Sequence, residues 1–214
     1  MDEEVSIINT KTRNEKIKDF LIQNKKGIIV FFSSIILIVI IFLGFNEYKD
    51  KKRIEISNTY NSSIIDYKPS TKEITVSQLI QIIEEKDSTY SPLALFFIID
   101  NELISDISKI NLLFDIIIEK TSLEEEIKYL IIYKKGLFNA NSTNEEKLLN
   151  ILRPIINSNS VWKSHALYLL AEFFFSNNER IKSKEFFNQL IILENANQDL
   201  IREAQKRLNR DLSD

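Results

Sequence analysis

The side chains that could carry chemistry in this chain are few and lie far apart in the sequence. The single histidine, His165, stands three residues after Trp162 on a segment with helical apolar spacing, and the chain contains no cysteine. A lone imidazole on such a helix more often packs or faces solvent than binds metal, because carboxylates would have to complete the site. No nucleophile can be paired with a base. We therefore expect no catalytic residue and no metal ligand.

Two other features with chemical potential have structural explanations. Glu124, Glu125 and Glu126 stand at the expected start of a helix, where carboxylates interact favourably with the positive end of the helix dipole. Three glycines in the whole chain exclude a phosphate-binding loop of the GxGxxG or GxxxxGK type. The sequence predicts a protein that is not an enzyme and binds no cofactor.

Aromatic side chains are the remaining candidates for binding. Trp162, Tyr168 and the run Phe173 to Phe175 could form an aromatic surface, although a stripe of this kind more often belongs to a core. In a protein built from helix pairs, the first helix of each pair usually lines the concave surface. On that basis the candidate protein-binding residues are Tyr129, Tyr133, His165 and Tyr168.

The apolar segment Gly27 to Phe45 determines where the rest of the chain lies relative to a membrane. Its nineteen residues carry no charge and only two polar side chains, and at about 1.5 Å per residue the helix would match the thickness of a bilayer core. A buried core helix is one alternative, but such helices are apolar on one stripe and this one is apolar all round. A cleavable signal peptide is the other, and the 26-residue polar region before the segment argues against it. We expect an uncleaved membrane anchor in contact with lipid.

The anchor divides the chain into a cytoplasmic tail (1–26), a transmembrane helix (27–45) and a periplasmic domain (46–214). The tail holds six basic residues, against four soon after the span, and this bias places the N-terminus in the cytoplasm of a bacterium and the domain beyond the inner membrane. Within the tail, residues 13–24 could form an amphipathic helix at the membrane surface or remain a disordered leader. The domain keeps 22 basic and 26 acidic residues, which excludes a nucleic-acid surface.

Helical periodicity dominates residues 46–214. Gly136 is the sole glycine there, and only Pro92 and Pro154 follow Pro69, so the turns of a many-stranded sheet are missing. An apolar stripe through Ile56, Tyr60, Ile64 and Tyr67 predicts a helix that leaves the membrane and ends before Pro69. Further helix starts are signalled at Thr75 with Gln78, Ser91 before Pro92, Ser105, Ser122 with Glu125, Thr143 with Glu146, Ser160 and about Asn178. The fold class is therefore all-α.

These starts recur at spacings of 31 to 38 residues, which bracket the 34-residue period of the tetratricopeptide repeat. In that repeat a small residue on the first helix faces a large apolar residue on the second. Such pairs, each sixteen residues apart, are Ala94 with Ile110, Gly136 with Leu152, and Ala171 with Phe187. A helix over Gln198 to Leu212 would close the stack. We expect a tetratricopeptide-like domain of helical repeats.

Three stretches together carry a resemblance to a known family: DEEV at Asp2 to Val5, KDFLIQNKKG at Lys18 to Gly27, and VWKSHALYLLAEFFFSNNERIKSKEFFNQL at Val161 to Leu190. With its single span, the chain resembles the YfgM-like family of membrane-anchored, tetratricopeptide-like ancillary subunits of the Sec translocon, in its alphaproteobacterial type. The resemblance implies three partners: the translocon, a membrane-anchored periplasmic prolyl isomerase chaperone, and exported polypeptides. A scaffold subunit of another envelope complex, for cell division or outer-membrane assembly, is the alternative.

Overall fold

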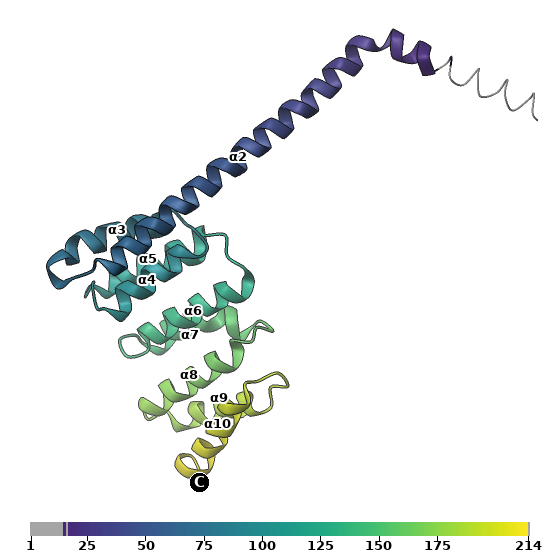
Figure 1. Ribbon diagram of the computed structural model, residues 1–214. Coiled ribbons are helices and arrows are strands. Elements are labelled where there is room, and N and C mark those ends of the chain that lie inside the picture. Colours follow the sequence, from purple (N-terminus) through teal and green to yellow (C-terminus); the bar gives the residue numbers. More distant parts are fainter. Residues whose placement is uncertain (1–14, 16, 214) are drawn as a thin grey trace, which may run out of the picture. The chain divides into compact units, whose positions relative to one another are not determined.

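The computed structural model describes residue 15 and residues 17–213, apart from the side chain of Ile28 (Figure 1). The described residues form helices and no strand, which confirms the all-α fold class. They divide into two compact units, with the boundary between Glu55 and Ile56.

Helix α2 (Lys25–Ile65) contains the predicted anchor. Among the described helices it is the one whose length and apolar composition suit a membrane span, and none of its apolar window is buried by protein. A buried core helix would be covered by its neighbours, and in the described residues this window is not. The predicted tail helix lies partly outside the described residues, but residues 17–23 are helical and expose Ile17, Phe20 and Leu21.

The second unit is a series of helices that pack in chain order (Figure 1). After a short 3-10 turn η1 (Pro69–Thr71) they are α3 (Lys72–Glu84), α4 (Tyr90–Asp100), α5 (Ile107–Lys120), α6 (Glu125–Asn139), α7 (Glu145–Ile156), α8 (Lys163–Ser176), α9 (Arg180–Ile191) and α10 (Gln198–Asp211). Each packs against the next, and α3 with α5, α6 with α8 and α8 with α10 also touch. The closing helix is confirmed almost to the residue.

The predicted apolar stripe at the end of α2 is also confirmed. Ile56 is buried, and Tyr60, Ile64 and Tyr67 pack against the same apolar cluster. The helix ends at Ile65, four residues before Pro69, so Tyr67 makes its contact from the following turn.

The predicted helix starts lie near the real ones, yet neighbouring residues do the capping. Asp106, not Ser105, caps α5, and Asn144, not Thr143, caps α7. At α4 the Asp87 carboxylate accepts from the backbone N–H groups of Thr89 and Tyr90, each at 2.8 Å. At α5 and α7 the Asp or Asn directly follows the predicted Ser or Thr, and at α4 the Asp lies four residues before Ser91. In each case its side-chain oxygen accepts from the free N–H groups instead.

Four further predicted starts are wrong in detail. Thr75 is buried inside α3, which begins at Lys72. The N-caps of α6 and α9 are Glu124 and Glu179, so the predicted Ser122 and Asn178 lie just outside those helices. Ser91 is buried within α4, where its hydroxyl donates to the Ile82 carbonyl oxygen at 2.9 Å and so ties α4 to the end of α3.

Each of the predicted small and large pairs is buried. Gly136 lies on α6 opposite Leu152 on α7, while Ala171 on α8 and Phe187 on α9 share one apolar cluster. Ala94 and Ile110 share the first cluster, but α4 has its more extensive contact with α3, not with the expected partner α5. The expected pairing of a first with a second helix therefore does not describe α4 and α5.

Candidate protein-binding surface

The four residues predicted to bind partners lie on α6 and α8, which pack against each other. All four are partly exposed. The structure brings Tyr133 and His165 together, with ring centroids 5.7 Å apart. Tyr129 instead donates a hydrogen bond to Glu125 Oε1 at 3.0 Å, and Tyr168 packs edge-on against the buried Phe187. The predicted surface is thus centred on two of its four members.

Trp162 completes this centre. Its ring is stacked on Tyr133 at 5.7 Å and 22°, and it lies 5.0 Å from the ring of His165. We call Tyr133, Trp162 and His165 the aromatic cluster. All three side chains are partly exposed, so the cluster presents rigid aromatic surface to solvent.

A chain of hydrogen bonds holds Trp162 in place. Ser160 Oγ donates to Glu126 Oε2 at 2.7 Å and accepts from the Trp162 backbone N–H at 3.1 Å. The predicted acidic run thus begins a helix, as expected, and one of its members also fixes the loop that carries Trp162. The N-cap of α8 is Trp162 itself, and the predicted Ser160 serves as an acceptor two residues earlier.

Burial keeps the aromatic cluster uncharged near neutral pH. Desolvation lowers the pKa of His165 below its ordinary value, and a hydrogen bond with the Val161 backbone only partly opposes this. Desolvation also raises the pKa of Tyr133. An imidazole and a phenol that are both neutral suit an apolar ligand with a few hydrogen-bonding groups.

The remaining aromatic candidates belong mainly to the core. Phe173 and Phe174 are buried, which confirms the structural interpretation of that stripe. Phe175 is partly covered by the Arg207 guanidinium, 4.2 Å from its ring centre. Arg207 also forms two hydrogen bonds of 2.7 Å with the Glu172 carboxylate, and these contacts attach α10 to α8.

A recess of about 230 Å³ adjoins the aromatic cluster. Trp162 and His165 form one wall, and residues 195–197, between α9 and α10, form the other. Val161, 64% exposed, stands at its edge. An apolar side chain entering here would contact the cluster directly.

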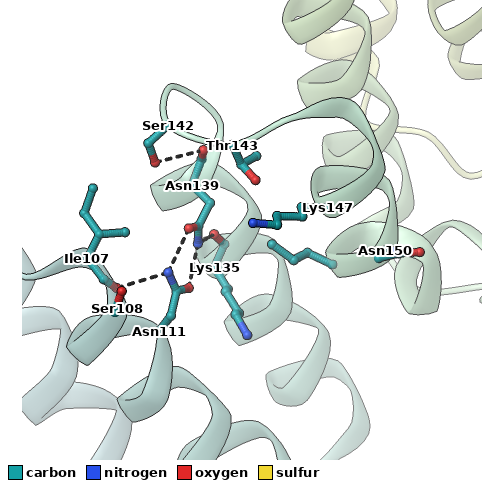
Figure 2. A pocket seen from close by; sticks show the side chains of 10 residues that line it. Ile107, Ser108, Asn111, Lys135, Asn139, Ser142, Thr143, Lys147 and Asn150 are labelled. Carbon is teal, nitrogen blue, oxygen red and sulfur yellow. Dashed lines mark hydrogen bonds between the residues drawn. The ribbon is translucent and has the colours of Figure 1, made fainter.

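A second and larger cavity, of about 460 Å³, opens between α5, α6 and α7 (Figure 2). At its floor Asn111 and Asn139 exchange two amide hydrogen bonds of 2.9 and 2.8 Å, and Asn139 is buried. No sequence pattern predicts this cavity, because these asparagines follow no motif and asparagine is common in the chain.

Within the described residues, no group of three or more His, Asp or Glu side chains could hold a metal ion. Comparisons with models of protein families, with curated proteins and with solved structures found no match.

Proposed function

We propose that this protein is a membrane-anchored scaffold that binds polypeptide partners through the aromatic cluster and catalyses no reaction. The observation that carries the proposal is the partly exposed stack of Tyr133, Trp162 and His165. Rigid aromatic side chains of this kind are enriched in protein interfaces, because they bury large surfaces at a small cost in entropy. The hydrogen bonds through Ser160 fix the surface before any partner arrives.

The architecture of the scaffold is part of the same proposal. The buried pairs Gly136 with Leu152 and Ala171 with Phe187 support a tetratricopeptide-like register over α6 to α9. The helices α6 and α8, which carry the aromatic cluster, would be the first helices of two repeats.

The resemblance to YfgM-like proteins supplies the partners: the Sec translocon, a membrane-anchored periplasmic prolyl isomerase chaperone, and exported polypeptides. The excess of basic residues before the span supports a cytoplasmic N-terminus and a periplasmic domain. Confinement at the membrane would raise the effective concentration of such partners toward about the millimolar range, so that individually weak contacts suffice.

Site-specific crosslinking in cells tests the proposal. Photo-crosslinking side chains at Tyr133 and Tyr168 of the full chain should capture translocon subunits, a periplasmic chaperone or exported polypeptides. A crosslinker at Ile181, which is 79% exposed on α9, is the matched control and should capture far less.

Two other outcomes would change the proposal. Capture of cytoplasmic proteins alone would overturn the proposed topology. Capture of cell-division or outer-membrane assembly subunits, with no Sec component co-purifying in mild detergent, would replace the translocon with the alternative envelope scaffold.

A further inference from the structure

We propose that the cavity between α5, α6 and α7 is a second binding site, which takes a carboxylate group of a polypeptide together with an adjoining aliphatic side chain. The cavity lies outside the aromatic cluster and shares no residue with it. Its volume of about 460 Å³ falls in the range of pockets that hold small ligands, roughly 300 to 1,000 Å³.

The charge of the cavity selects an anion. None of its lining residues is an Asp or a Glu, and Lys147 extends into it from α7 (Figure 2). Within the described part of the chain, no carboxylate forms an ion pair with the Lys147 ammonium. The other lysine of the lining, Lys135, is already engaged, because its Nζ lies 2.5 Å from Asp115 Oδ1. Lys147 is therefore the available cation.

Neutral donors surround that cation. Ser108, Thr143 and Asn150 border the cavity with two hydroxyl groups and one amide. The Asn111 and Asn139 amides behind them are paired with each other and with backbone carbonyls, so the floor is fixed and does not compete for the ligand. One ammonium and several neutral donors match the charge of a carboxylate.

The helix starts beside the cavity argue against a phosphate ligand. Phosphate sites commonly use free N–H groups at a helix start. Here Asp106 accepts from the N–H groups of Ser108 and Lys109, and Asn144 accepts from the N–H of Lys147. Each helix start beside the cavity thus already uses its own side chain as a cap, so fewer N–H groups remain there for a phosphate.

The aliphatic part of the ligand follows from the two apolar lining residues. Ile107, 45% exposed, and Ile151 stand at the cavity beside the polar groups. A peptide that ends in an aliphatic residue would place its carboxylate near Lys147 and its side chain against these isoleucines.

Matched peptides test this assignment on the full chain in detergent. The probe is a rhodamine-labelled Gly-Ser-Ile-Leu peptide with a free C-terminal carboxylate, followed by fluorescence anisotropy. Its C-terminal amide is the first comparison, and an amidated peptide with an internal Glu is the second. We expect the free carboxylate to bind and the neutral amide to bind at least about tenfold more weakly, since a hydrogen bond to a charged group contributes about that factor. Binding of the Glu peptide would show that the site accepts a side-chain carboxylate as well as a C-terminal one.

The protein variants are Lys147→Gln and its control Lys128→Gln, which removes another exposed lysine from α6 outside the cavity. Lys147→Gln should abolish the preference for the carboxylate, whereas Lys128→Gln should retain it. Because Lys147 is exposed, circular dichroism should show an unchanged fold. The assignment is overturned if neither carboxylate peptide binds, if the amide binds equally well, or if inorganic phosphate at the peptide's concentration displaces it. A Trp162→Ala variant that binds the peptide normally while losing crosslinked partners would separate this site from the proposed scaffold surface.

Discussion

Leu152 occupies the space that a side chain at Gly136 would need. A Cβ atom built on Gly136 would lie 2.5 Å from Leu152 Cδ2 and 3.1 Å from Leu152 Cγ. Leu152 is fully buried in an apolar cluster with Leu148, Ile155 and Leu170. Helices α6 and α7 therefore cross as closely as a glycine allows.

Replacing Gly136 by alanine should destabilise the domain. Overpacking costs about 1 to 3 kcal/mol, and the better helix propensity of alanine returns about 1 kcal/mol. We expect a lower midpoint in thermal unfolding of the detergent-solubilised chain, followed by circular dichroism.

The Leu152→Ala background provides the control for this crossing. That substitution alone should cost about 2 to 5 kcal/mol, since it leaves a cavity. On that background Gly136→Ala should become stabilising, because the clash is gone and the propensity gain of about 1 kcal/mol remains. A stabilising Gly136→Ala in the natural chain would contradict the close crossing.

Ala171→Leu probes the equivalent crossing of α8 and α9. Ala171 and Phe187 are fully buried in one apolar cluster, so the added atoms should overpack it and cost about 1 to 3 kcal/mol. The matched control is Ala140→Leu at the partly exposed end of α6. Equal unfolding midpoints for the two variants would show that the assigned register is wrong.

Substitution of Ser183, unlike the preceding substitutions, should not destabilise the domain. It is fully buried on α9, and within the described structure its hydroxyl has no hydrogen-bond partner. Removing an unsatisfied buried hydroxyl should leave stability unchanged or raise it by about 1 kcal/mol. Chemical denaturation of Ser183→Ala measures this directly, and a clear loss of stability would reveal a partner for the hydroxyl.

His165 should make stability depend on pH in the mildly acidic range. Burial lowers its pKa in the folded state, so the unfolded chain binds the proton more readily. The stability that neutral His165 contributes is fully present above the unfolded-state pKa of about 6.5. It is lost as the pH falls through the lower folded-state pKa. His165→Phe should flatten this part of the profile, and a natural chain with no slope there would contradict the burial effect.

Protonation of Asp211 should destabilise the closing helix α10 at lower pH, separately from the effect of His165. Hydrogen bonding to Arg210, with a further contribution from Arg207, lowers the pKa of Asp211 to about 2. The stabilisation is present above the ordinary value near 4 and disappears as the pH falls toward 2. Hydrogen exchange should show α10 loosening in that interval, and Asp211→Asn should remove the effect of this residue.

The sequence predicted helices more reliably than it predicted their ends. Periodicity placed the stripe around Ile56, because that pattern depends on which face is buried, and the expected repeat stack placed the closing helix α10. Caps are decided by competition between adjacent oxygens, as at Ser105 and Asp106, where both residue types are suitable and the local geometry selects one.

The candidate surface likewise has a part that the sequence predicted and a part that depends on long-range contacts. Tyr133 and His165 were recognised as positions on expected first helices. The place of Trp162 depends on the bond between Ser160 and Glu126, residues 34 apart in the chain, which no local pattern encodes. The cavity of Figure 2 likewise depends on Asn111 meeting Asn139 from another helix, 28 residues away.

The order of helix contacts also governs how quickly the domain can fold. The extensive contacts in the described part of the second unit join helices that are adjacent in the chain or next but one. Such low contact order is typical of domains that fold in microseconds to milliseconds. A chain delivered with its N-terminus first can therefore complete α3 with α4 before α9 exists, and every later helix finds its docking surface already formed. At each stage the apolar face left uncovered is the one on which the next helix packs, and α10 covers the face that α8 and α9 leave.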